Sequence, residues 1–115
     1  RLIFAGVTGN SNYANVAWYD GSWHDIAAPA NGWQTLGFVL ASGGNGTIYR
    51  NNGSLGSAAY TDKAIGGTTV ISKAYNSSSA YLTGDIAEMI LYDSALSDTD
   101  RGKVETYLNN KWAIY

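Results

Sequence analysis

The chain has no cysteine, which excludes disulfide bonds and metal sites built from thiolates. Charged residues make up only 14% of it and the net charge is −2. The seven basic residues are scattered, so the clustered Lys and Arg that bind nucleic acid or anionic membranes are missing. No apolar run approaches the roughly 18 residues of a membrane-spanning helix. These absences predict a protein that neither binds nucleic acid nor inserts into a membrane.

The residues that are present favour a turn-rich β protein. Hydrophobic residues make up 45% of the chain and aromatic residues 13%, which is enough to build one modest core. The 14 glycines, together with many Asn and Ser, supply the positive φ angles that turns require. We therefore expect a single domain over residues 1–115.

Short strand-like runs recur along the chain with turn residues between them, as in all-β proteins. They cover residues 2–7, 13–19, 22–27, 33–41, 47–50, 54–59, 68–72 and 81–92. Asp20-Gly21 and Asn51-Asn52-Gly53 predict two hairpins.

The last part of the chain predicts one amphipathic helix. Ser97 is placed to be its N-cap, and Asp100 stands three residues later, close to the capping-box pattern. The spacing i, i+3, i+4, i+8 predicts an apolar stripe that packs on the strands. This stripe consists of Val104, Tyr107, Leu108 and Trp112.

The C-terminal third resembles the closing motif of bacterial and viral laminin-G-like (concanavalin A-like) jelly-roll domains. The matching residues are Gly84-Asp85-Ile86-Ala87-Glu88, Tyr92, Ala95-Leu96-Ser97-Asp98, Tyr107-Leu108 and Lys111-Trp112, with a second match at the hairpin of residues 47–53. The resemblance implies an all-β, antiparallel β-sandwich (jelly roll) with one short C-terminal α-helix. Complete members are longer, so we expect the chain to be the C-terminal portion of the fold. Upstream strands or a partner chain would then cover a sheet edge that is otherwise prone to association.

No catalytic pattern emerges. The single histidine, His24, is followed by Asp25, but adjacent residues of a strand point to opposite faces and cannot pair as neighbours. There is no Gly-x-Ser-x-Gly motif, phosphate loop or zinc-ligand spacing. Asp85 and Glu88, three apart, would also face opposite sides of a strand rather than form a glycanase pair. We expect no enzymatic activity, and Glu88 is expected to accept hydrogen bonds from a neighbouring loop.

Carbohydrate binding is the leading functional hypothesis. Sugars are held by aromatic rings beside a few planar polar groups, and residues 10–34 contain this mixture. Trp18, Trp33 and Trp112 are expected in the core, which leaves Trp23 as the exposed ring. The candidate ligand-binding residues are Tyr13, Asn15, Trp23, His24 and Asp25, with Tyr75 and Asn76 as a weaker second set.

No cofactor is required, but the resemblance admits a Ca²⁺ ion at the rim, because family members often bind one there through Asp and Asn oxygens. Asp20 and Asp25 are the candidate ligands, and a purely structural role in turns is the alternative. Asp62, Asp93, Asn10 and Asn12 are further oxygen donors without a recognisable Ca²⁺ loop.

The sequence thus predicts a non-catalytic recognition or adhesion module that binds glycans. Its expected place is extracellular, at a cell or virion surface. The alternative is a structural virion or surface-assembly protein, such as a decoration, fibre or adhesion subunit. In that case its partners are neighbouring protein subunits and it is oligomeric or part of a larger assembly.

Overall fold

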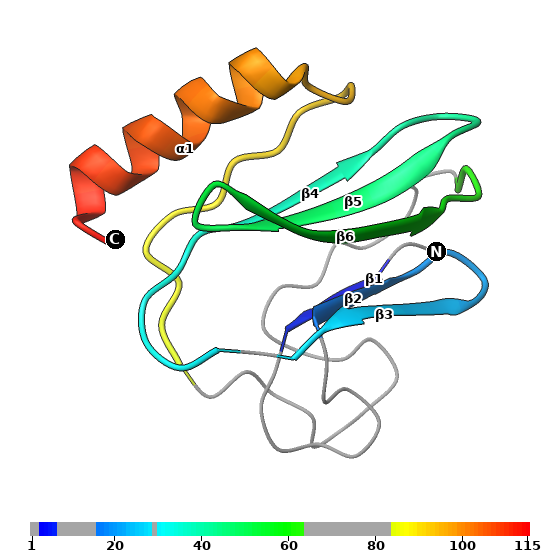
Figure 1. Ribbon diagram of the computed structural model, residues 1–115, viewed down its shortest axis with the longest axis horizontal. Helices are drawn as coiled ribbons and strands as arrows, with labels where there is room; N and C mark the ends of the chain where they lie inside the picture. Colours follow the sequence, from blue (N-terminus) through cyan, green and yellow to red (C-terminus); the bar gives the residue numbers. More distant parts are fainter. Residues whose placement is uncertain (1–2, 7–15, 29, 64–83) are drawn as a thin grey trace.

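The computed structural model describes residues 3–6, 16–28, 30–63 and 84–115. In chain order the elements are β1 (Ile3–Gly6), β2 (Val16–Tyr19), β3 (Trp23–Ala27), β4 (Leu36–Leu40), β5 (Asn45–Arg50), β6 (Gly53–Ala59) and α1 (Asp98–Trp112) (Figure 1). The strands form two antiparallel three-stranded sheets, ordered β1-β2-β3 and β4-β5-β6. The predicted content, antiparallel strands followed by one C-terminal helix, is confirmed.

Both predicted hairpins are present. β2 and β3 are joined by the turn after Tyr19, where Gly21 adopts a φ of 127°. β5 and β6 are closed by a two-residue loop, since Arg50 pairs directly with Gly53. Asn51 and Asn52 in this loop have φ angles of 49° and 67°. Two consecutive positive φ angles match the right-handed twist of the flanking strands, which is why asparagine is favoured here.

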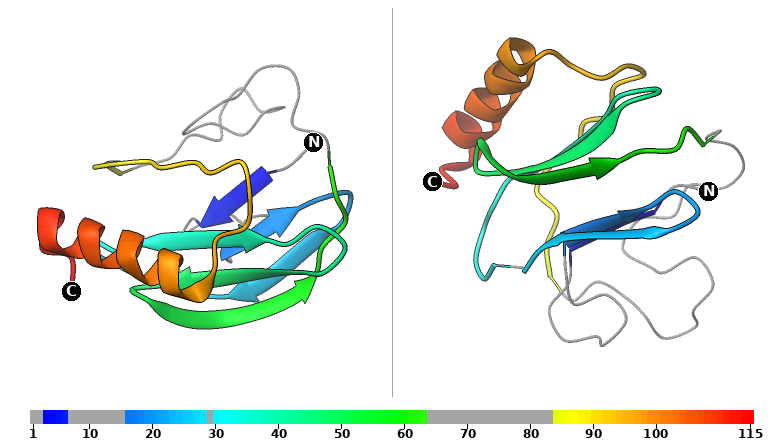
Figure 2. Two further views of the ribbon diagram at one scale, coloured as in Figure 1. Left: turned by 90° about the horizontal axis from the view of Figure 1, so that it is seen from above. Right: turned by 45° about the vertical axis from the view of Figure 1, so that its right-hand side comes forward.

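The core lies between the two sheets, which are stacked in the right-hand view of Figure 2. Its fully buried side chains are Val16 and Trp18 from the first sheet and Ile48 from the second. The Trp18 indole lies over Gly46, where an added Cβ atom would be 2.7 Å from Trp18 Cζ2. The partly buried residues packed around these side chains are Ile26, Leu36, Phe38, Leu40, Leu55, Ala58 and Tyr60. The expectation that Trp18 belongs to the core is confirmed.

Trp33 was expected in the core and is instead 58% exposed, so that prediction is wrong. β4 begins only at Leu36, so Trp33 belongs to the connection before the strand. The strand alternation that would turn its side chain inward does not yet apply there.

Helix α1 begins as predicted. The Ser97 hydroxyl accepts a hydrogen bond from the Asp100 backbone N–H at 3.1 Å and donates to the Asp100 carboxylate at 2.8 Å. These bonds satisfy one of the backbone donors left free in the first turn. At the other end, Ala113 has a φ of 51° and its N–H donates to the Asn109 carbonyl.

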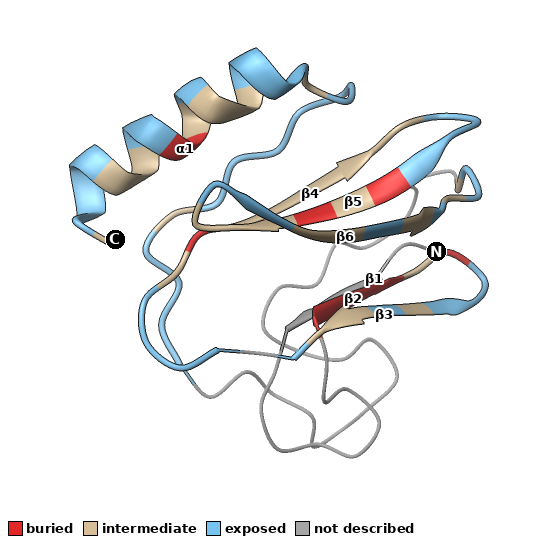
Figure 3. Ribbon diagram, viewed as in Figure 1, coloured by how far each residue is buried: buried red, intermediate tan, exposed pale blue. Residues whose placement is uncertain are grey.

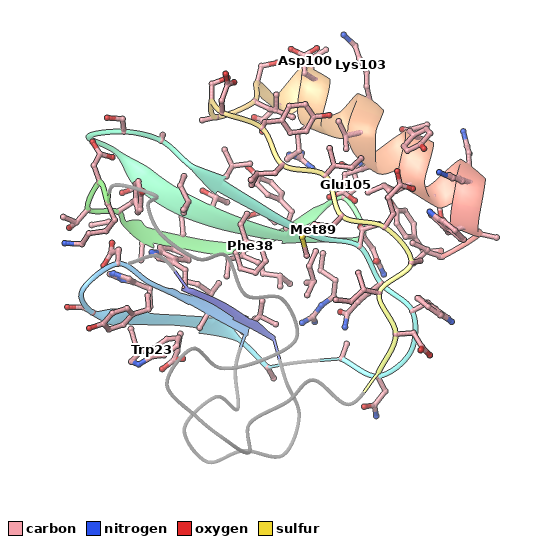
Figure 4. The ribbon with its side chains drawn as sticks, turned by 180° about the vertical axis from the view of Figure 1, so that it is seen from behind. Trp23, Phe38, Met89, Asp100, Lys103 and Glu105 are labelled. Carbon is pink, nitrogen blue, oxygen red and sulfur yellow. The ribbon has the colours of Figure 1, made fainter. Side chains whose placement is uncertain are left out.

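The helix covers the face of the second sheet that is turned away from the first (Figure 1). Its one buried residue is a carboxylate, Glu105, which lies over Gly37 and accepts a hydrogen bond from Thr35 Oγ1. Thr35 is in turn bonded to Asn51, whose Oδ1 accepts from the Thr35 backbone N–H at 3.0 Å. A polar chain therefore joins the β5–β6 turn to Glu105 in the middle of the helix, which Figure 4 labels.

A second attachment is made by Arg101 near the start of the helix. Its guanidinium carbon lies 3.7 Å from the centre of the Tyr49 ring, and its Nη1 donates to Asn52 Oδ1 at 2.8 Å. Arginine can bind both partners at once because its planar group stacks on an aromatic face while its edge donates hydrogen bonds. The helix is thus held by polar and cation–π contacts as well as by packing.

The predicted apolar stripe of the helix is correct only in part. Val104 and Leu108 are half-buried, but Tyr107 and Trp112 are exposed, so the prediction that Trp112 is a core residue is wrong. The Tyr107 hydroxyl and the Trp112 indole N–H instead donate hydrogen bonds to Glu88, outside the core.

The largest departure from prediction concerns residues 84–92, called here the open segment. They were expected to complete a strand over 81–92, and the structure assigns no strand to them. Figure 3 shows the segment almost wholly in the colour of exposed residues. A strand requires a neighbour for its backbone groups, and none of the described segments is hydrogen-bonded to this backbone. The predicted strand over 68–72 lies outside the described residues.

Candidate functional site

The outer side of the β2–β3 hairpin carries what we call the aromatic surface, made by Tyr19, Trp23 and Asp25. Tyr19 and Trp23 are direct partners across the antiparallel pair, and their ring centres are 5.2 Å apart with the planes tilted by 52°. Trp23 is 38% exposed and lies on the side of β3 turned away from the second sheet (Figure 4). Asp25, two residues along the same strand, is also exposed and shares this face.

His24 lies on the opposite face of β3 from Trp23 and Asp25. Its ring stacks on Trp18 with the centres 5.0 Å apart and the planes 22° apart. Its Nε2 lies 3.0 Å from Asp20 Oδ1. The structure therefore brings Trp23 and Asp25 together, whereas His24 belongs to the edge of the core.

Asp20 is a buried acceptor that holds the β2–β3 turn together. Its Oδ2 accepts from the Thr61 backbone N–H at 2.7 Å, and its Oδ1 accepts from His24 and, at 3.4 Å, from the Ser22 N–H. These donors, the Thr61 N–H above all, lower the pKa of Asp20 to about 2. Both oxygens are thus engaged by protein donors in the described structure.

The candidate metal ligands lie in different surroundings. Asp20 is buried within the turn, whereas Asp25 is exposed on the outer face of β3. Asp62 accepts a hydrogen bond from Ser42 Oγ at 2.6 Å, and Asp93 lies beside Ser94. Within the described ranges no group of three or more His, Asp or Glu side chains is placed to hold a metal ion.

Four of the predicted ligand-binding residues, Tyr13, Asn15, Tyr75 and Asn76, lie outside the described residues, as do Asn10 and Asn12. The aromatic surface is therefore described from Tyr19, Trp23 and Asp25. Tyr19 was not a predicted site residue. The hairpin register could have identified it, because a two-strand hairpin turning at Asp20-Gly21 places Tyr19 opposite Trp23.

The Asp20–His24 pair is the arrangement in the described structure that comes closest to an acid–base dyad. Its imidazole is half-buried against Trp18, and among the described residues no hydroxyl side chain is hydrogen-bonded to it. An activated nucleophile needs such a contact. In the described structure the pair stabilises the β2–β3 turn through hydrogen bonds.

A second polar cluster joins the open segment to the end of α1. Glu88 accepts from Tyr107 OH at 3.1 Å and from Trp112 Nε1 at 2.8 Å, and Lys111 Nζ lies 3.1 Å from its Oε2. The Trp112 and Lys111 donors lower the pKa of Glu88, and the Tyr107 hydroxyl and Glu88 raise the pKa of Lys111. The predicted scaffold role of Glu88 thus takes a different form, because its donors come from the helix and not from a loop.

No family model matches this chain, and neither the curated proteins nor the solved structures contain a match to it. The laminin-G-like resemblance therefore stays a prediction. In the described part of the chain, no helix has the length and apolar character needed to cross a membrane.

Proposed function

We propose that this protein is a non-catalytic recognition module that binds glycans through the aromatic surface. The observation that carries the proposal is the pairing of Trp23 with Tyr19 on the outside of the first sheet, with the Asp25 carboxylate on the same face. Aromatic faces pack against the C–H groups of sugars, and a carboxylate accepts hydrogen bonds from their hydroxyls.

Charge narrows the class of glycan. Asp25 places a negative group on the surface, and the chain as a whole carries a net charge of −2. Sialylated, uronic or sulfated sugars would be repelled, since like charges close together are unfavourable. The preferred ligand is a neutral glycan whose hydroxyls donate to Asp25.

The experiment is a comparison of Trp23→Ala with Trp33→Ala on a glycan array, followed by titration calorimetry. Trp33 is the matched control because it is an exposed tryptophan outside the aromatic surface. Loss of a central aromatic contact is expected to weaken binding about tenfold or more. The melting temperature of Trp23→Ala should change little, because the core cluster lies on the other face of the sheet.

Two results would contradict this assignment. One is unchanged glycan binding by Trp23→Ala. The other is an equal loss of glycan binding in Trp23→Ala and Trp33→Ala, which would mean that any exposed tryptophan binds glycans non-specifically. Binding restricted to sialylated or sulfated glycans would refute the preference for neutral sugars.

The proposed fold is a laminin-G-like β-sandwich, for which the stacking of the two sheets on a shared core is the support. Such a module would act outside the cell, at a cell or virion surface, where glycans are displayed.

A second function, structural assembly with other protein subunits, is favoured by a separate observation. The open segment exposes a run of large apolar side chains, and patches of this kind mark contact surfaces between proteins. The exposed residues are Ile86, Met89, Ile90, Leu91 and Tyr92. Replacement of Leu91 by Lys should prevent association with the neighbouring subunits, as measured by sedimentation. Trp33→Lys is the control and should leave this association unchanged.

A further inference from the structure

Three asparagines of the chain are followed directly by glycine. In such a pair the glycine backbone nitrogen can attack the side-chain amide carbon of the asparagine, because glycine has no side chain to block the approach. The reaction requires that the folded backbone lets these two atoms meet. The three pairs are Asn31-Gly32, Asn45-Gly46 and Asn52-Gly53, and the structure places each of them in a different setting.

The pair at Asn45 lies in β5, the central strand of the second sheet. Gly46 is paired with Leu40 on one side and with Ala58 on the other. It is also buried, and the Trp18 indole lies over it. The Gly46 nitrogen can therefore reach the Asn45 amide only after the sheet has opened locally, and such opening costs free energy in the paired part of a fold.

The pair at Asn52 is exposed but its side chain is held. Asn52 Oδ1 accepts a hydrogen bond from Arg101 Nη1 at 2.8 Å. The Asn52 backbone is in the left-handed region, with a φ of 67°, and Gly53 is already paired with Arg50. Attack by the Gly53 nitrogen would require this side-chain bond and the geometry of the turn to be given up.

The pair at Asn31 has neither kind of protection. It belongs to the connection between β3 and β4, outside any strand, and both of its residues are exposed. Gly32 has a φ of 86°. In the described structure, a Cβ atom added to Gly32 would meet no atom within 4 Å apart from those of its chain neighbours. The backbone at Gly32 is thus surrounded by open space in which it can rotate.

We propose that Asn31 is a site of spontaneous deamidation, and that the fold protects Asn45 and Asn52 from the same reaction. The Gly32 nitrogen loses its proton and bonds to the Asn31 amide carbon, and ammonia leaves as a five-membered cyclic imide closes. Water then opens the imide at either carbonyl. The products are aspartate, or isoaspartate in which the main chain runs through the former side chain.

The modification adds one negative charge next to Trp33, and the isoaspartyl product also adds one methylene group to the backbone that connects the two sheets. Residues 31 and 32 are not among the residues of the core cluster or of the aromatic surface. The modified chain should therefore keep its fold. The inference is independent of both functions proposed above.

The test incubates the folded chain in mildly alkaline buffer, because the attacking nitrogen must lose a proton. Chymotrypsin, which cleaves after aromatic residues, then yields peptides 24–33, 39–49 and 50–60, each with one of the three pairs. Mass spectrometry measures the conversion of each amide to an acid. Conversion at Asn31 should be at least about tenfold faster than at Asn45 or Asn52, which corresponds to a protecting free energy of about 1.4 kcal/mol.

Three controls show whether the fold makes the selection. Asn31→Gln should abolish the reaction in peptide 24–33, because glutamine would have to close a larger ring. In concentrated urea the three pairs should react at similar rates, since local protection is lost. Arg101→Lys removes the planar donor group that holds Asn52 and should speed the reaction there several-fold. Circular dichroism checks that each variant is folded.

The inference is overturned if Asn45 or Asn52 reacts as fast as Asn31 in the folded chain. It is also overturned if Asn31 stays intact in the folded chain while the chain in urea reacts. An unchanged rate at Asn52 in Arg101→Lys would refute the protection assigned to that hydrogen bond.

Discussion

Replacement of Gly46 by alanine tests the contact between the two sheets. A Cβ atom at position 46 would lie 2.7 Å from Trp18 Cζ2 and 2.7 Å from Leu40 Cδ2, closer than such atoms approach one another. The Leu40 methyl group can rotate away, but the Trp18 indole is fully buried in a close-packed core. Overpacking of this kind costs about 1–3 kcal/mol. We therefore expect Gly46→Ala to lower the melting temperature by about 5–15 °C.

Gly44→Ala is the matched control. A Cβ atom there would meet nothing closer than 3.5 Å, which is ordinary van der Waals contact. Without strain, a Gly→Ala change stabilises by up to about 1 kcal/mol, because it restricts the unfolded chain. Urea unfolding followed by circular dichroism gives the free energy of unfolding for both variants.

A double-mutant cycle identifies the group responsible. Trp18→Phe removes the part of the indole that lies over Gly46, so Gly46→Ala should cost less in that background by about 0.5–3 kcal/mol. An equal penalty in both backgrounds would refute the stated contact. So would a Gly46→Ala protein as stable as Gly44→Ala.

Two further predictions concern turns and caps. Ser97→Ala should destabilise the protein by about 1 kcal/mol in urea unfolding, because the Asp100 N–H loses its acceptor, whereas Ser97→Thr should be close to neutral. A Ser97→Ala protein as stable as Ser97→Thr would show that the cap does not contribute. The pKa of Asp20, lowered to about 2 from 3.8, makes its contribution to stability complete above about pH 4 and lost as the pH falls toward 2. The urea midpoint of the wild type should therefore fall more steeply between pH 4 and pH 2 than that of Asp20→Asn, and parallel slopes would disprove this role.

The features that were predicted correctly depend on residues close together in the chain. The hairpin at Asn51 and Asn52 follows from the tolerance of asparagine for positive φ, a property of the residue itself. The start of α1 follows from Ser97 and Asp100, whose side-chain and backbone atoms meet three residues apart. Such local interactions form in the same way wherever the segment lies in the fold.

The candidate site was predictable only in part. Trp23 and Asp25 share a face because a strand alternates, which the sequence pattern already implies. The position of Tyr19 beside Trp23 depends on the register of the hairpin. The role of Asp20 depends on a hydrogen bond from Thr61, which is 41 positions away in the sequence. Contacts over that distance in sequence leave no local signal.

The four tryptophans show where the sequence stops being informative. All of them are equally apolar as residues, yet Trp18 is fully buried between the sheets while Trp33 and Trp112 are exposed. Burial depends on which surfaces pack against each other. The indole N–H of Trp112 donates a hydrogen bond to the Glu88 carboxylate, and the side chain lies outside the core. The reverse case is Glu105, a polar residue that is buried and whose carboxyl group accepts a hydrogen bond from Thr35.

By itself, then, the sequence determined the strands β1 to β6, the two hairpins and the capped C-terminal helix, because propensity, turn chemistry and capping act within a few residues. The tertiary structure decided which aromatic side chains are buried, which face carries Trp23 beside Tyr19, and that the apolar run of residues 86–92 has no strand partner among the described segments. A strand exists only when another strand lies beside it, and that condition is set by packing at long range.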